Sequence, residues 1–178
     1  MTDKSLDELK SAFNVLLDLP NIEVDEVEID REGNYRATIH STERGTHCHQ
    51  CGHFSDHFYG CGEFITLRHL ALFGRQVELR LRLPRYQCQR CQGQPTTTQR
   101  ATWYDHRSSC TQAFEKQVLL ACVNSTVLDA SIKEGIGYET VGGIIDRFIA
   151  KNVDWQAIKN LKIIGIDAIS LKKDTKIL

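Results

Sequence analysis

The sequence predicts an α+β protein assembled from several small modules. Three observations indicate this. Alternating apolar and polar residues typical of strands fill much of the first half, two matching cysteine motifs lie in that half, and apolar residues recur at helical spacing from residue 109 onward. We expect the chain to divide into four consecutive parts, which are residues 1–45, 46–107, 108–152 and 153–178.

Composition narrows the class of protein. Hydrophobic residues make up 41% of the 178 residues and charged residues 25%, which is ordinary for a globular protein. The acidic N-terminus lacks the apolar core of a signal peptide, and no apolar run approaches the roughly 18 residues of a membrane span. The sequence therefore predicts a cytoplasmic protein without a membrane partner. In that compartment the seven cysteines would be metal ligands or core thiols rather than disulfides.

Charge is distributed unevenly along the chain. Residues 1–43 hold 11 acidic and 4 basic side chains, whereas residues 44–107 hold 4 acidic and 9 basic ones. Such a difference between neighbouring segments favours a protein in which one part faces nucleic acid and another part does not.

The first part reads as a helix followed by an acidic β-hairpin. Apolar residues follow helical spacing through residues 5–18, and Pro20 ends that helix. The stretches "IEVDEVEID" and "YRATIHS" then alternate between apolar and polar residues, and "REGN" between them has the composition of a turn.

Two C-x-x-C motifs, "CHQC" and "CQRC", dominate the second part. Two such motifs supply four thiolates, which is the complete tetrahedral shell of a structural Zn²⁺, so residues 46–107 are predicted to form a zinc ribbon. The predicted zinc ligands are Cys48, Cys51, Cys88 and Cys91. His49, His53 and Cys61 lie close by, so replacement of one ligand stays open, and a set of reduced buried cysteines is the alternative to a metal site.

A second hairpin is predicted between the two cysteine motifs, with "FITLRHLALFG" as one strand and "RQVELRLRLPRYQC" as the other. In the second strand Val77, Leu79, Leu81 and Leu83 share one face, and the opposite face, with Glu78, Arg80 and Arg82, is mostly basic. This face would either contact phosphates or be solvated. The residues of this strand that we expect to contact nucleic acid are Arg80, Arg82 and Arg85.

Three helices are predicted in the third part, within 109–126, 126–134 and 138–152. The last two flank a break at "GIG", where Gly135 suits a turn with positive φ, and together they predict a helix-turn-helix over residues 126–150. We expect the small Ala130 or Ser131 to allow a close helix crossing. A plain helical hairpin within a core is the alternative.

The third of these helices would be the recognition helix of the helix-turn-helix, spanning 139–150. Its apolar side chains Val141, Ile144, Ile145 and Phe148 are expected to point inward. The residues expected nearest to DNA bases are Tyr138, Glu139 and Thr140, and those expected to contact phosphates are Arg147 and Lys151.

The last part contains "LKIIGIDAISLKK", an apolar, β-branched run that ends at Asp167 and reads as a buried strand. The order of "CHQCG", "LRHLALFGRQVELRLRLPRYQCQRC", the helix-turn-helix and "IGIDAISLKK" resembles the N-terminal portion of a family of bacterial insertion-sequence transposases. The resemblance begins near residue 14. It implies a zinc-binding domain, a helix-turn-helix and the first strand of an incomplete RNase H-like catalytic domain with a DDE carboxylate triad.

By this resemblance Asp167 stands at the first catalytic acid, although Ala168 occupies a position where the family usually has an acidic residue. Two-metal phosphodiester chemistry needs several carboxylates, so Mg²⁺ is expected only in an intact catalytic domain. The resemblance thus implies a truncated transposase that binds double-stranded DNA at insertion-sequence ends, is inactive alone, and is compatible with a homo-oligomer. The alternatives are a stand-alone DNA-binding regulator and a zinc-stabilised protein-interaction module.

Overall fold

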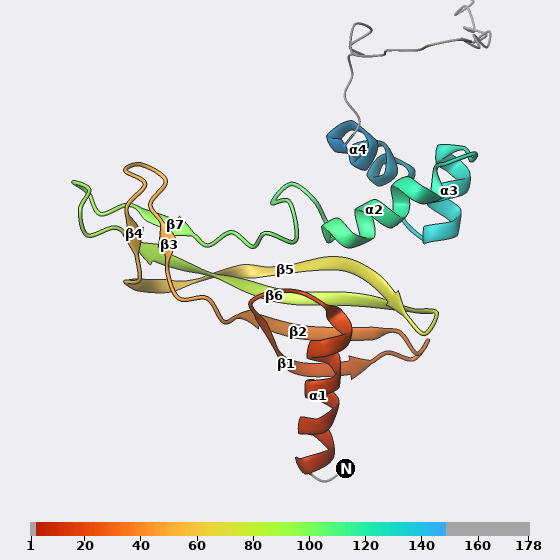
Figure 1. The fold of residues 1–178 in the computed structure, drawn as a ribbon, viewed down its shortest axis with the longest axis horizontal. Coiled ribbons are helices and arrows are strands. Elements are labelled where there is room, and N and C mark those ends of the chain that lie inside the picture. The colour runs from red at the N-terminus through yellow and green to blue at the C-terminus, as the bar shows by residue number, and fades with distance from the viewer. Residues whose placement is uncertain (1–2, 149–178) are drawn as a thin grey trace, which may run out of the picture.

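The computed structural model describes residues 3–148, which form a sheet with one helix, two short cysteine-bearing turns and a bundle of three helices (Figure 1). In chain order the elements are α1 (Asp3–Leu17), β1 (Ile22–Ile29), β2 (Tyr35–Ser41), β3 (Thr46–His47), β4 (Phe54–Ser55), β5 (Phe58–Leu72), β6 (Arg75–Gln87), β7 (Thr96–Thr98), α2 (Gln112–Ala121), α3 (Val127–Glu134) and α4 (Tyr138–Phe148). The strand predicted to end at Asp167 lies outside the described residues.

The two predicted hairpins form, and they join into one sheet. Its strand order is β1-β2-β6-β5, with β7 paired to β6. The joint is the parallel pair of β2 and β6, in which Ala37 lies opposite Leu79 and Ile39 opposite Leu81. These four side chains are buried and share the inner face, so the apolar alternation of each strand fixes the register of the other. The sheet therefore continues across residue 45, where the sequence suggested a boundary between two parts.

The inner face of the sheet is covered by α1 and by a segment near residue 103. Phe13 and Leu17 of α1 are buried against the sheet, as are Trp103 and Tyr104. On β6 the predicted alternation is confirmed, because Val77, Leu79 and Leu81 are buried while Arg80 and Arg82 are exposed; Leu83 and Glu78 are partly buried. A single apolar core thus fixes which face of β6 presents arginines to solvent.

The three C-terminal helices pack around their own core. Buried Cys110, Phe114, Val118, Ala130, Val141 and Ile144 form it. The side chains of Thr126 and Asp129 form a capping box at the start of α3. Gly135 ends α3 in the left-handed conformation with φ of 64°, as the sequence predicted, because a residue without Cβ tolerates that geometry.

The prediction was wrong for one of the residues of α4 that were expected to point inward. Val141 and Ile144 are fully buried and Ile145 is partly buried, as expected, but Phe148 is 42% exposed. Phe148 lies four residues after Ile144, at the last residue of α4, beyond the reach of the core that α2 and α3 supply.

The helical bundle is attached to the free edge of β5. The backbone N–H of Arg68 donates to the Ser109 carbonyl (2.8 Å), and the Thr111 N–H donates to the Arg68 carbonyl (2.9 Å). Buried His69 adds a side-chain link, with Nδ1 2.9 Å from Thr111 Oγ1 and Nε2 3.1 Å from the Leu17 carbonyl. The start of the bundle thus satisfies part of an exposed strand edge, which would otherwise offer unpaired backbone groups.

Candidate metal centre and nucleic-acid interface

The four predicted zinc ligands come together at one end of the sheet (Figure 1). Cys48 and Cys51 lie in the turn between β3 and β4, and Cys88 and Cys91 lie in the turn between β6 and β7. The two turns are built alike. The Cys48 N–H donates to the His53 carbonyl (2.8 Å), and the Cys88 N–H donates to the Pro95 carbonyl (2.9 Å). Each hairpin therefore presents a pair of sulfurs from a fixed loop.

The sulfur positions fit a tetrahedral ion. All four Sγ atoms lie within 4.8 Å of one another; Cys48 and Cys91 are 3.9 Å apart, and Cys51 and Cys88 are 3.7 Å apart. A tetrahedral zinc with Zn–S bonds of about 2.3 Å requires sulfur–sulfur edges of about 3.8 Å. The cluster could therefore hold a structural zinc through its four thiolates, and such a closed set of ligands stabilises a fold rather than performing chemistry.

The backbone of each turn favours the thiolate form of its first cysteine. N–H groups of Cys51 and Gln50 donate to Cys48 and lower its pKa to about 6, and N–H groups of Arg90 and Cys91 likewise lower the pKa of Cys88. The hydrogen bond with the Cys51 sulfur, burial and then the Cys88 and Cys48 sulfurs raise the pKa of Cys91 to about 12, and the negative charge of Cys48 adds repulsion against a Cys91 thiolate. A divalent cation at the centre would remove this repulsion, which is how such a site couples metal binding to proton release.

The alternative ligands stay outside the cluster. His49 points to β7, where its N–H donates to Thr97 Oγ1 (3.2 Å) and its Nδ1 lies 3.0 Å from the same oxygen. His53 is exposed and contributes only its backbone carbonyl to the turn, and Cys61 is exposed on β5. Among residues 3–148, the four cysteines of the two matching motifs are the ligand atoms that lie within reach of one ion.

The predicted arginines of β6 are held against aromatic rings. The guanidinium carbons of Arg80 and Arg82 lie 4.1 Å and 3.9 Å from the ring centroid of Phe64, and Arg85 lies 5.8 Å from that of Tyr59. Sequence reasoning missed both aromatic residues. Phe64 lies directly opposite Arg82 in the strand register, so only the register reveals the stack. Contact with a ring restricts where each charge points.

The structure describes Tyr138, Glu139, Thr140 and Arg147 of the residues that we predicted to contact DNA from the helix-turn-helix. Tyr138, at the start of α4, is exposed, and Thr140 is half-buried. Arg147 forms an ion pair with Glu115 of α2, a side chain only 1% exposed, and also donates to Ser108 Oγ (3.3 Å). Its charge is thus compensated within the protein, and it fixes α4 to α2. Lys151 and Asp167 lie outside the described residues.

Glu115 was not singled out from the sequence, although one signal was present. It stands three and four residues before Val118 and Leu119, so it shares the apolar stripe of α2. An acid on an apolar stripe needs a buried partner, and the partner could have been sought among the cations of the neighbouring helices.

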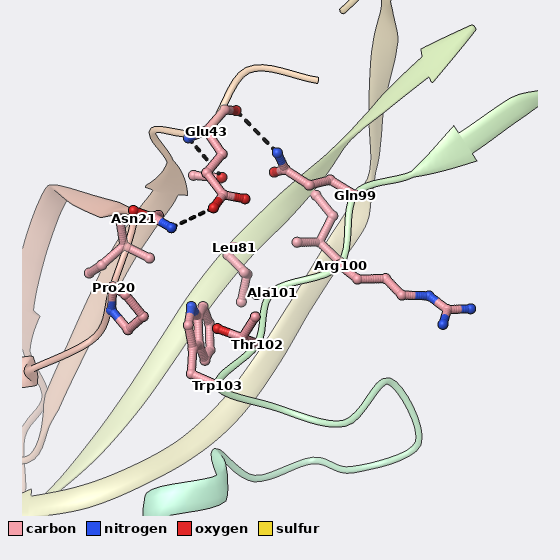
Figure 2. A pocket seen from close by; sticks show the side chains of 12 residues that line it. Pro20, Asn21, Glu43, Leu81, Gln99, Arg100, Ala101, Thr102 and Trp103 are labelled. Atoms are coloured by element: carbon pink, nitrogen blue, oxygen red, sulfur yellow. Dashed lines mark hydrogen bonds between the residues drawn. The ribbon is translucent and has the colours of Figure 1, made fainter. Parts of the chain in front are cut away.

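The segment from β7 to α2 connects the cysteine end to the helices. Gln99 donates through Nε2 to the carbonyls of Glu43 and Gly45 (both 3.1 Å), and the Asn21 amide donates to the Glu43 carboxylate. Figure 2 shows the chain running from there over Leu81 to Trp103, around a small hollow of about 20 Å³. This segment is therefore fixed to the sheet before it enters the helices.

Comparison with known proteins identifies the helical part. Residues 99–149 match the family described as the helix-turn-helix domain of transposase family ISL3. This match confirms the resemblance to insertion-sequence transposases over that region and assigns the bundle to a class of DNA-binding domain. Searches of curated proteins and of solved structures gave no significant match. Within residues 3–148, no helix has the length and apolar character needed to span a membrane.

The match starts at Gln99, earlier than the boundary at 108 expected from the sequence. The added residues include Trp103 and Tyr104, which are buried against the sheet. The matched region thus includes residues 99–104, which we call the strap and which pack against the sheet before the helices begin.

Proposed function

We propose that this chain is the DNA-binding N-terminal part of a DDE transposase, acting in the cytoplasm on double-stranded DNA at the ends of an insertion sequence. The observation that supports the proposal most is the match of residues 99–149 to a transposase helix-turn-helix, together with a packed three-helix bundle over the same residues. The four-cysteine cluster agrees with the zinc-binding domain that the resemblance implies. The role of Asp167 as a first catalytic acid, with Mg²⁺, rests on the resemblance alone.

Base contacts would come from the start of α4. In helix-turn-helix proteins the N-terminal residues of the second helix reach the base edges in the major groove. Tyr138 is exposed at that position and Thr140 follows it by two residues. Gly142 and Gly143, one turn further, offer no side chains, so base readout would rest on few residues.

Phosphate contacts would come from the outer face of β6. Arg80 and Arg82 are exposed, and within the described residues neither forms an ion pair. Phe64 holds both guanidinium groups, which reduces the entropy lost when they bind a phosphate. Arg36 on β2 is different, because it already pairs with Glu28 and Glu78.

The experiment is fluorescence anisotropy of the zinc-loaded chain with a duplex carrying candidate element ends and with a scrambled duplex, over a series of salt concentrations. We expect specific binding that weakens steeply with salt, as counterions are released. Tyr138→Ala should reduce the preference for the element-end duplex, whereas Arg80→Gln with Arg82→Gln should weaken both duplexes alike. Arg36→Gln is the matched control and should change little. An affinity for neither duplex, even at low salt, would disprove the proposal.

A further inference from the structure

A groove lies between the cysteine end and the start of the helix-turn-helix region. It has a volume of about 310 Å³, and its walls come from the first cysteine turn, from β7 and from the segment that follows β7. The lining residues that matter here are His49, Thr97, Thr98, Arg100, Tyr104 and His106. We call it the β7 groove.

The walls of the β7 groove differ in chemistry from those of four other hollows within residues 3–148. Each of the four includes a carboxylate in its walls, from Glu43, Glu23, Asp30 and Asp105 respectively. The walls of the β7 groove contain no carboxylate; beside the apolar Leu83 and the Gln99 amide they carry hydroxyls, two imidazoles and one guanidinium. Hydroxyl, imidazole and guanidinium groups are hydrogen-bond donors, and donors of this kind are the usual partners of phosphate oxygens in DNA complexes.

The cysteine cluster fixes one wall of the groove. His49 stands between Cys48 and Cys51, and both its backbone N–H and its Nδ1 contact Thr97 Oγ1 on β7. β7 in turn pairs with β6 directly after the second cysteine turn. The first cysteine turn and β7 are therefore joined through His49 and Thr97 into one wall.

The opposite wall is fixed by the strap that leads to the helices. Gln99 is anchored to the Glu43 and Gly45 carbonyls, and Trp103 is buried, so the backbone of Arg100 is held on both sides. Figure 2 shows the Arg100 side chain leading away from the hollow beside Trp103. Within residues 3–148 Arg100 has no ion pair, whereas His106 lies 3.6 Å from Asp105. Arg100 thus supplies the uncompensated charge of this wall.

We infer that the β7 groove holds the sugar–phosphate backbone of duplex DNA, with Arg100 as its main phosphate contact and Thr98 as a neutral donor. The inference rests on the proposed function, because it assumes that the chain binds DNA, and it adds a contact surface between the metal centre and the helix-turn-helix. A backbone contact is independent of sequence, so the groove would set affinity and orientation while α4 reads the bases.

The test is anisotropy of the full, zinc-loaded chain with the element-end and scrambled duplexes. Arg100→Gln should weaken both duplexes by about three- to tenfold and reduce the slope of log affinity against log salt by about 1, because one phosphate contact is lost. Thr98→Val added to Arg100→Gln should weaken both further. The matched control is Arg31→Gln, which removes one exposed arginine from the turn between β1 and β2 and should stay within about 1.5-fold of the parent. Zinc content and thermal unfolding of each variant report that it is folded.

Three results would overturn the inference, and they differ in what they say of the proposed function. Equal behaviour of Arg100→Gln and Arg31→Gln, with normal binding by the parent, would reject the groove and leave the proposed function intact. A loss confined to the element-end duplex would show that Arg100 reads sequence rather than backbone. An absence of binding by the parent to either duplex would reject the groove and the proposed function together.

Discussion

The cysteine end and the helical bundle of this protein differ in what stabilises each of them. Residues 46–55 and 88–98 form strands of two or three residues, contribute no member to either apolar cluster of the described residues, and leave Phe54 47% exposed. The bundle has six buried residues around one centre, a capping box and an ion pair between Arg147 and the buried Glu115. A segment without an apolar core needs another source of cohesion, and the four sulfurs offer one.

This difference predicts which parts of the protein need a bound metal ion to stay folded. The sheet has its own apolar core, which extends from α1 to Trp103 and does not include the cysteine turns. Loss of a bound ion should therefore release the two turns and β7 while the sheet, α1 and the helices stay folded. A substitution at one end, followed by a measurement of stability or metal content at the other end, tests whether the two ends are independent.

The largest effect is expected from a zinc ligand. Cys88→Ser removes a buried thiolate, and because structural zinc contributes on the order of 10 kcal/mol to small sites, we expect loss of the metal and of order in both turns. Metal content by mass spectrometry is the measurement. Cys122→Ser is the control, because Cys122 packs beside the helical core and lies outside the cluster. Retention of a full equivalent of zinc by Cys88→Ser would contradict the assignment of Cys88.

A core substitution in α4 tests the other end. Ile144→Ala should lower the free energy of unfolding of the bundle by about 2–5 kcal/mol, because it leaves a cavity among fully buried side chains. Ile132→Ala makes the same chemical change at a side chain that is 71% exposed and should cost at most about 0.5 kcal/mol. Both should keep their zinc. Denaturant unfolding followed by circular dichroism gives the two changes in unfolding free energy. Equal changes for the two substitutions would contradict the assignment of Ile144 to the core of the bundle.

The ion pair between helices should have a smaller effect. Arg147→Ala leaves the Glu115 carboxylate buried without its cation, and we expect a cost of about 1–3 kcal/mol. Adding Glu115→Gln to Arg147→Ala should recover part of that cost, since the buried charge is then absent. The same unfolding measurement compares the single and double variants. A single variant as stable as the parent would mean that Arg147 is free to contact DNA phosphates instead.

The smallest effect is a dependence on pH at His69. Burial lowers the pKa of His69 below its ordinary value, and its hydrogen bonds require the neutral form, in which Nε2–H donates to the Leu17 carbonyl and Nδ1 accepts from Thr111 Oγ–H. The unfolded chain takes up this proton first as pH falls below about 6.5, so stability is full above that pH and declines as pH falls towards the folded pKa. His69→Gln should flatten this decline in unfolding curves recorded between pH 7.5 and about 5. An unchanged slope in that variant would assign the pH dependence to the other histidines.

Local patterns in the sequence predicted much of this fold. The alternation along β6, the two cysteine motifs and the break at Gly135 each specify geometry within a few residues, and each is confirmed. The parallel pairing of β2 with β6 was not predictable in the same way, because it joins residues about 40 positions apart and either hairpin edge could have served. The stack of Arg80 and Arg82 on Phe64 depends on strand register, and the role of Arg147 depends on Glu115 in another helix.

Amide hydrogen exchange with and without a zinc chelator tests the division between the two ends most directly. We predict that chelation removes protection from the turn amides of Cys48, Gly52, Cys88 and Gln94, which donate to backbone carbonyls within the two cysteine turns. Amides of α2 and α4, such as those of Val118 and Ile144, should keep their protection, because an apolar core holds them. Equal loss of protection across residues 112–148, or unchanged protection in both cysteine turns, would contradict a metal-held end attached to a core-held DNA-binding bundle.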